Sequence, residues 1–220
     1  MIKFDWNSFF TNILAVVLGI FITFWIQGII DRKQERKEVM SALELVKEEL
    51  INNTDNLKDV INIINSERSS AQSLQGYIGN IYQCSVDSLV VWNAYLGNEY
   101  FFTVTNDALE LLKSSSLFQK INDKSLALGI IKAYDYLEAD SKAFNTHEEY
   151  KISIFMDANT EKMKNASLVS DGPDFLRAFY STPEAQYCLK SIIELSEDSF
   201  LSSSVPEIEA TIASLTSRMK

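Results

Sequence analysis

Residues 6–30 read WNSFFTNILAVVLGIFITFWIQGII and contain no Asp, Glu, Lys or Arg. At a helical rise of about 1.5 Å per residue, the apolar run 9–30 would cover about 33 Å, enough to cross a hydrocarbon core of about 30 Å. A signal peptide is the competing interpretation, but its apolar core is only about 7 to 15 residues long and ends at a small-x-small cleavage site. We therefore expect a retained transmembrane helix.

The sequence directly after this stretch is basic. Residues 31–37 read DRKQERK, whereas only Lys3 and the amino terminus are basic before residue 6. By the positive-inside rule, the amino terminus lies outside and everything after residue 30 lies in the cytoplasm. Four side chains of this segment are expected to contact anionic lipid headgroups: Arg32, Lys33, Arg36 and Lys37.

Composition indicates an all-α body after the span. Seven Gly and three Pro in 220 residues are too few for a sheet protein with many tight turns. The two cysteines, Cys84 and Cys188, are far apart and form no CxxC, so neither a disulfide framework nor a zinc site is predicted. The formal net charge of −10 disfavours nucleic acid as a partner.

The span is predicted to continue into a cytoplasmic helix, because residues 31–66 contain neither Gly nor Pro. Apolar residues recur seven apart in two interleaved series, which are Leu43, Leu50, Leu57 and Ile64, and Val39, Val46, Asn53 and Val60. Flanking apolar residues widen this stripe beyond a two-stranded seam, which favours a bundle helix over a free coiled coil. Asn53, polar within the stripe, either fixes register or faces a loop.

The rest of the chain divides into shorter helices. The polar run 65–75 is predicted to be a turn or frayed junction, and 77–82 to be helical. Further helices are expected at 86–97 after a Ser85 cap, at 107–113 after Thr105 or Asn106, and from an Asn122-Asp123 cap to Met163 or beyond. Shorter helices are expected at 173–180, after a Thr182 cap, and at 207–219. The aromatic stretch 99–104 has no partner strand and is interpreted as a packed loop.

The predicted fold is therefore all-α, with one N-terminal transmembrane helix continuing into an irregular cytoplasmic helical bundle. The chain divides into an extracytoplasmic N-terminus and span at 1–30, a juxtamembrane amphipathic helix at 31–66 and a cytoplasmic helical domain at 67–220.

Candidate catalytic groups are sparse. His147 is the only histidine, and Tyr150 and Lys151 occupy the positions three and four residues later where a helical metal site would need a ligand. Glu44 and Glu48 stand one turn apart, but the Glu-x-x-His element of di-iron bundles is missing, so a solvated face is the better interpretation. No phosphate-binding glycine loop or GxSxG element is present. We predict no catalytic residue, cofactor or metal, and no enzymatic activity.

The span carries small and hydrogen-bonding residues on one side. Ala15, Gly19, Thr23 and Gln27 recur every four residues, and Asn12 lies on the adjoining edge. Such small-xxx-small faces allow close helix packing in lipid, so these five residues are predicted to mediate transmembrane self-association. The alternative is that Asn12 and Gln27 merely lie near the two membrane interfaces.

Two stretches of the chain form recognisable motifs. The first is Leu14 to Gln27 with its following basic residues. The second is Leu109-x-Leu-Leu-Lys-Ser-Ser-Ser116 with Leu117, Ile121, Asp123, Leu126 and Tyr134. Together they resemble a family of uncharacterised bacterial single-pass membrane proteins with a helical cytoplasmic domain. The family usually has Gly after the paired serines, where this chain has Ser116. The resemblance implies a bacterial inner-membrane topology and supplies no catalytic residue.

These features predict a membrane-anchored, oligomeric helical scaffold or sensor that binds a protein partner in the cytoplasm. The alternative is a regulated membrane-disrupting, pore-forming effector of a bacterial antiphage defence system. The expected partners are the lipid bilayer, further copies of the chain and a cytoplasmic protein.

Overall fold

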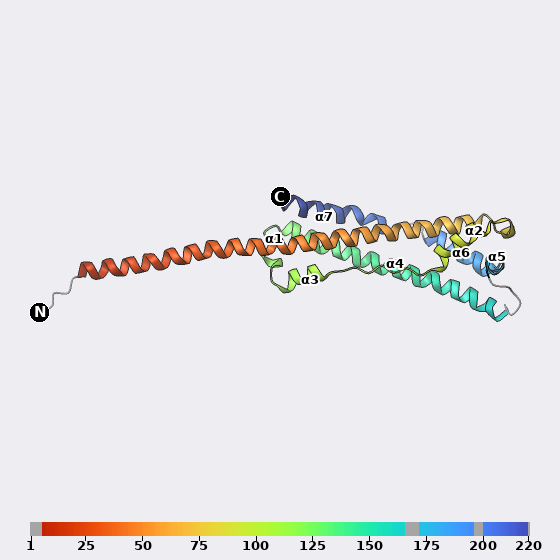
Figure 1. Cartoon of the computed structure of the whole chain (residues 1–220), viewed down its shortest axis with the longest axis horizontal. Coiled ribbons are helices and arrows are strands. Elements are labelled where there is room, and N and C mark those ends of the chain that lie inside the picture. The colour runs from red at the N-terminus through yellow and green to blue at the C-terminus, as the bar shows by residue number, and fades with distance from the viewer. Residues whose placement is uncertain (1–5, 166–171, 196–199, 220) are drawn as a thin grey trace.

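A computed structural model describes residues 6–165, 172–195 and 200–219, and throughout these ranges the regular elements are helices. One long apolar N-terminal helix projects from an elongated helical body (Figure 1). The all-α prediction is confirmed.

Helix α1 (Trp6–Gln75) contains 70 residues and runs through the projection and the body without a break. Its described side chains from Leu14 to Glu38 are exposed or half-exposed, and burial begins at Val39. The predicted turn at 65–75 is wrong. Residues 65–75 contain no Gly or Pro, and Ala71 and Leu74 keep one face of the helix buried, so helical hydrogen bonding continues.

The predicted helix at 77–82 is also wrong. Residues 76–80 form a turn in which Gly79 has φ of 89°, a conformation that glycine adopts without a steric penalty. Only the short 3₁₀ turn η1 (Ile81–Gln83) follows.

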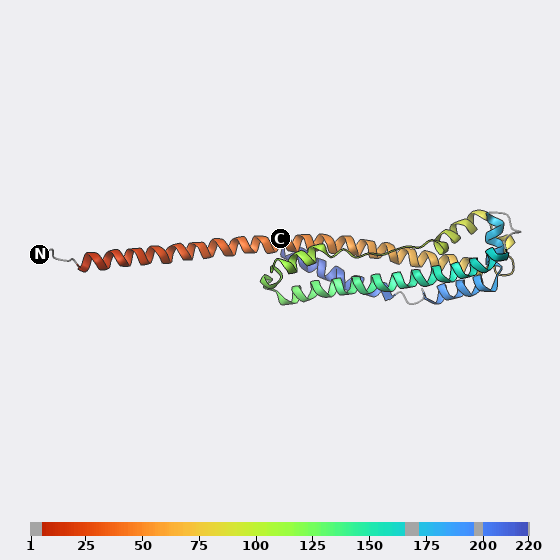
Figure 2. The ribbon, with the colours of Figure 1, turned by 90° about the horizontal axis from the view of Figure 1, so that it is seen from below.

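The body is an up-down-up-down arrangement (Figures 1 and 2). From the end of α1 the chain returns through α2, an extended segment and α3, then runs up α4 and back through α6 and α7. The remaining elements are α2 (Val86–Gly97), α3 (Asp107–Ser114), η2 (Phe118–Lys120), α4 (Lys124–Asn165), α5 (Pro173–Tyr180), α6 (Pro183–Leu195), η3 (Phe200–Ser203) and α7 (Val205–Arg218).

The heptad stripe of α1 is the centre of this body. All eight stripe residues from Val39 to Ile64 are buried, at most 9% exposed. The seven apolar ones pack with apolar residues of α3, α4 and α7. The bundle-helix interpretation is thus confirmed for the chain. A second apolar cluster at the far end joins the last turns of α1 to α2, α5 and α6, and contains the unpaired, buried Cys84 and Cys188.

Local side-chain caps explain the starts of α2, α4 and α6. The Ser85 side chain accepts a hydrogen bond from Ser88 N at 3.1 Å, Asp123 Oδ1 accepts from Leu126 N at 3.0 Å, and Thr182 Oγ1 accepts from Ala185 N at 3.2 Å. Asn106 precedes α3 but makes no side-chain cap. Glu49 of α1 supplies the acceptor instead, at 3.0 Å from Ala108 N.

Ser116, just after α3, has φ of 61°. This left-handed conformation costs an L-residue roughly 1–2 kcal/mol and is the one that glycine accommodates after a helix. Ser115 occupies the preceding cap position and donates its hydroxyl to Leu111 O at 2.7 Å.

Candidate functional site

The extended segment 99–106, here called the strap, connects α2 to α3 between α1 and α4. A buried backbone segment needs hydrogen-bond partners, which a neighbouring strand would normally supply. Here the partners are side chains of the two long helices. Phe102, 2% exposed, packs its ring into the apolar core and confirms the packed-loop interpretation.

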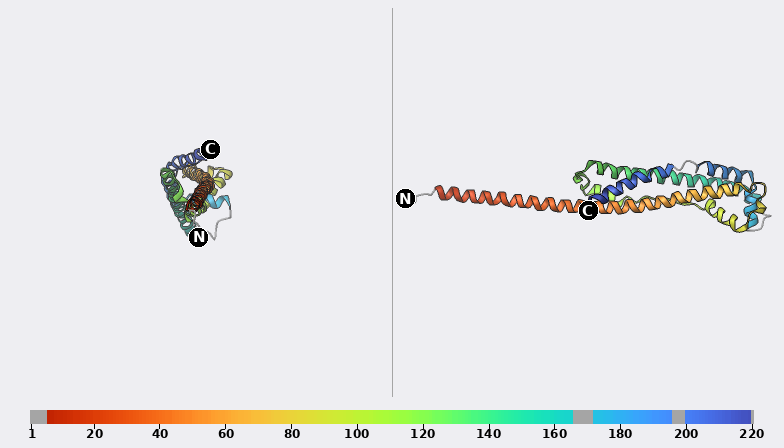
Figure 3. Two further views of the ribbon diagram at one scale, coloured as in Figure 1. Left: turned by 90° about the vertical axis from the view of Figure 1, so that its left-hand side faces the viewer. Right: turned by 90° about the horizontal axis from the view of Figure 1, so that it is seen from above.

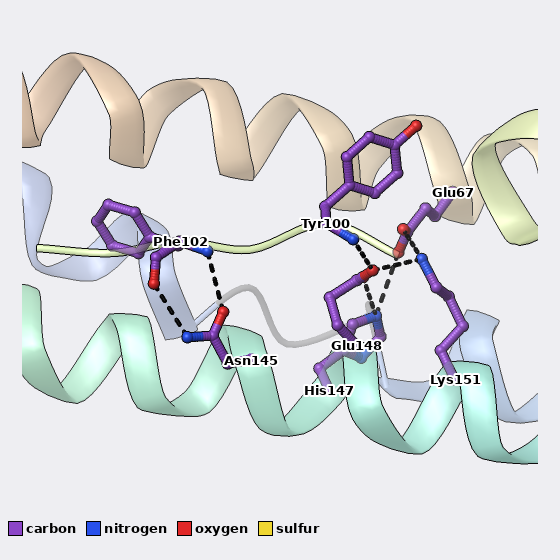
Figure 4. Close-up of polar contacts among 7 residues, drawn as sticks. All are labelled: Glu67, Tyr100, Phe102, Asn145, His147, Glu148 and Lys151. Carbon is purple, nitrogen blue, oxygen red and sulfur yellow. Dashed lines mark hydrogen bonds and ion pairs between the residues drawn. The ribbon is translucent and has the colours of Figure 1, made fainter. Parts of the chain in front are cut away.

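Two asparagines act as substitutes for a strand edge, because a carboxamide has both an acceptor and a donor. Asn145 of α4 accepts from Phe102 N at 2.9 Å and donates to Phe102 O at 3.0 Å (Figure 4). Asn53 of α1 accepts from Thr105 N at 3.1 Å and donates to Thr105 O at 2.7 Å. Of the two roles proposed for Asn53, the loop-facing one is correct.

The strap is also tied to a charged cluster made of Glu67 on α1 and His147, Glu148 and Lys151 on α4. Lys151 Nζ bridges the carboxylates of Glu67 and Glu148, at 2.7 Å from Glu148 Oε2, and all three side chains are fully buried. Glu148 Oε2 also accepts from Tyr100 N at 2.9 Å (Figure 4). The Lys151 ammonium lies 5.3 Å from the centroid of the Tyr100 ring.

The cluster lies between the two apolar clusters of the body. On α1, Glu67 falls between Ile64 of the first and Ala71 of the second, and on α4 the charged residues fall between Phe144 and Phe155. The ion pair between Glu67 and Lys151 therefore joins α1 and α4, which run in the same direction, at one point along their length. Any sliding of α1 against α4 would leave buried charges unpaired, at a cost of several kcal/mol per ion.

The cluster has two carboxyl groups, Glu67 and Glu148, for the single ammonium of Lys151. Burial, and then the neighbouring Glu67 charge, raise the pKa of Glu148 from 4.5 to about 7, against the opposing effect of Lys151. His147 Nε2 lies 3.2 Å from Glu67 Oε2 and 3.9 Å from Glu148 Oε1. Glu148 Oε1 is buried without a hydrogen-bond partner among the described residues. A proton on Glu148 would leave one carboxylate, Glu67, paired with one ammonium, Lys151.

Glu67, His147 and Glu148 could also hold a metal ion, since one ligand atom from each lies within 4.8 Å of the others. Lys151 argues against this role, because its ammonium already serves as the cation between both carboxylates and would repel a divalent ion a few ångströms away. We assign the cluster to holding the strap and the register of α1 against α4.

Sequence reasoning missed this cluster because it tested His147 only against its neighbours on the same helix. Glu67 and Lys151 are 84 positions apart in the chain. A signal was nevertheless present. Glu67 continues the heptad series of Val60, and Lys151 continues a seven-residue series through Leu137 and Phe144. Charged residues in two buried stripes predict a buried pair. Glu44 and Glu48 are exposed, as expected for a solvated face.

The projecting part of α1 carries the residues predicted to self-associate. Ala15, Gly19, Thr23 and Gln27 are all exposed on the helix surface, and the Asn12 side chain lies outside the described residues. Thr23 Oγ1 donates to Gly19 O at 2.8 Å, and Gln27 Nε2 donates to Asp31 Oδ1 at 2.9 Å. These donors are thus used within the helix, while a Cβ added at Gly19 would have nothing within 4 Å. Association through this face stays a prediction.

The basic residues after the projection, Arg32, Lys33, Arg36 and Lys37, are exposed around α1 just before it enters the body. We call these four residues the basic collar.

No family model, curated protein or solved structure matches this chain.

Proposed function

We propose that the chain is a single-pass inner-membrane protein whose cytoplasmic body serves as an oligomeric scaffold or sensor for a protein partner. The observation that carries the membrane part is the exposure of the projecting helix. Twelve large apolar side chains between Leu14 and Ile30 are 42–73% exposed, and none of the most apolar window is buried against the body.

The exposed apolar surface surrounds α1 on all sides, so one partner helix would not cover it, whereas lipid would. At about 1.5 kcal/mol for each side chain, covering the twelve would contribute on the order of 20 kcal/mol. The basic collar on one side supports an orientation with the body in the cytoplasm.

The continuity of α1 supports a scaffold or sensor. No break separates the apolar projection from the buried stripe, so a rotation or shift of the span would move the first helix of the body with it. The charged cluster of Glu67, Glu148 and Lys151 contacts the strap and joins α1 to α4 inside the body.

Fractionation tests the anchor. The full chain should remain in the membrane pellet after alkaline extraction. A chain lacking residues 1–30 should become soluble and stay folded, because the described side chains of this segment, from Leu14 on, contribute nothing to the apolar core of the body. A reporter active only in the periplasm, fused after Lys220, should be inactive, and a cytoplasmic fluorescent reporter at the same point should be bright. Release of the full chain by alkali would refute the proposal.

Measuring the membrane potential on expression separates the scaffold from the pore-forming alternative. A scaffold should leave the potential unchanged. Loss of the potential that disappears on deletion of residues 1–30 would instead favour the effector.

A further inference from the structure

A cavity of about 490 Å³ lies where α1 enters the body. It is lined by the segment 32–43 of α1, by 120–126 at the start of α4, and by Arg218 at the end of α7. Figure 3, left, looks along α1 from its N-terminal end, with α4 and α7 beside it. The cavity is therefore at the end of the body nearest the apolar projection.

The rim of this cavity is positively charged in an otherwise acidic chain. Its basic residues are Arg32, Arg36, Lys120 and Arg218, and its acidic residues are Glu35 and Asp123, so four positive charges face two negative ones. Lys120 pairs with Glu35 at 2.8 Å, and Arg218 pairs with Asp123. The net charge of the whole chain is −10.

Arg32 and Arg36 are the cations that remain available, since neither has an acidic partner within the described structure. They stand one helical turn apart and both line the cavity, so their guanidinium groups can converge on one ligand. Guanidinium groups bind phosphate through paired, charge-assisted hydrogen bonds.

The depth of these arginines matches lipid headgroups. At about 1.5 Å per residue, Arg32 lies about 3 Å and Arg36 about 9 Å beyond Ile30, where the apolar run ends. The headgroup region is roughly 5–8 Å thick on each side of the hydrocarbon core. Below the arginines, Val39, Leu43 and Leu126 form an apolar floor that limits water around a bound anion.

We propose that this cavity binds the phosphate of an anionic phospholipid from the cytoplasmic leaflet, with Arg32 and Arg36 as its phosphate ligands. The proposal rests on the proposed membrane anchoring. Of the four residues of the basic collar, Arg32 and Arg36 line the cavity, whereas Lys33 and Lys37 do not. A bound headgroup would connect α1 to the start of α4 and the end of α7, and would fix the orientation of the body beneath the membrane.

The two pairs provide a matched experiment. The full chain in non-ionic detergent is compared with Arg32→Gln/Arg36→Gln and with Lys33→Gln/Lys37→Gln, which remove equal charge from the same helix. Each is titrated with phosphatidylglycerol, phosphatidylcholine and sodium phosphate while the melting temperature of the body is recorded. Saturating phosphatidylglycerol should raise this temperature by about 5 °C in the parent and in the lysine variant. The arginine variant should require at least about tenfold more lipid.

Three results would overturn the proposal. If both double variants lose lipid affinity equally, the lipid is held by general charge attraction. If phosphatidylcholine raises the melting temperature as much as phosphatidylglycerol does, the anionic headgroup is not recognised. If sodium phosphate raises it as much, the cavity is a free-anion site. Both arginines are exposed, so the double arginine variant should melt at the temperature of the parent when no lipid is added. If its melting temperature differs, the single variants Arg32→Gln and Arg36→Gln replace it in the titration. Alkaline extraction of the parent tests anchoring separately, since the detergent titration does not depend on it.

Discussion

Replacing Lys151 with Met removes the ammonium of the charged cluster while keeping a long apolar side chain in its place. Two fully buried carboxylates, Glu67 and Glu148, would then lack their cation. Breaking a buried ion pair by removing one partner costs about 3–5 kcal/mol. We expect the lower end, about 3 kcal/mol, because burial raises the pKa of Glu148, and a proton on this carboxyl would offset part of the lost charge.

For a chain of this size, 1 kcal/mol corresponds to about 2–4 °C in melting temperature, so Lys151→Met should melt roughly 10 °C lower. The assay is thermal and guanidinium unfolding of the full chain in detergent micelles, followed by far-UV circular dichroism. The matched control is Lys132→Met, since Lys132 is an exposed lysine on the same helix and its loss should cost less than about 0.5 kcal/mol.

A second variant tests the electrostatic reason. Adding Glu67→Gln to Lys151→Met removes one of the two uncompensated charges and should restore part of the lost stability, although Glu67→Gln alone should destabilise the parent. If Lys151→Met unfolds within about 1 kcal/mol of the parent, or if the double variant is no more stable than Lys151→Met, the cluster does not hold α1 against α4 in the way described.

Three further predictions concern other parts of the chain. The pKa of Glu148 is raised from 4.5 to about 7, so its contribution to stability is complete below pH 4.5 and is lost as the pH rises to about 7. The unfolding free energy of the parent should therefore fall relative to that of Glu148→Gln between these two pH values. The difference between the two proteins should stay constant above about pH 7. Ser116→Gly relieves a left-handed serine and should raise the unfolding free energy by about 0.5–1 kcal/mol, whereas Ser114→Gly within α3 should lower it. Gly19→Ile should weaken the oligomers that are cross-linked in native membranes, whereas Ile22→Leu should not. An unchanged oligomer in Gly19→Ile, or a monomeric parent, would show that the helix face containing Gly19 contacts only lipid.

Local signals in the sequence predicted most helices and their buried faces, although the end of α1 at 65–75 and the turn at 76–80 were predicted wrongly. Helical hydrogen bonds join residues four apart, so the signals for a helix and its caps lie within the segment, as at Ser85, Asp123 and Thr182. The heptad series from Val39 to Ile64 showed which face of α1 is buried, because that periodicity is a property of the one helix. The apolar projection was evident for the same reason, since its composition alone distinguishes it from the body.

The contacts that each buried face makes depend on the arrangement of the helices in space. The strap is held by Asn53 and Asn145, which lie 52 and 43 positions from the residues they bind, and the charged cluster joins Glu67 to Lys151 across 84 positions. A periodic pattern identifies a buried position but not its partner, because the partner depends on how α1, α4 and the strap are arranged in space. The cavity beside the apolar projection has the same origin, since Arg32, Lys120 and Arg218 come together only when α4 starts and α7 ends beside α1.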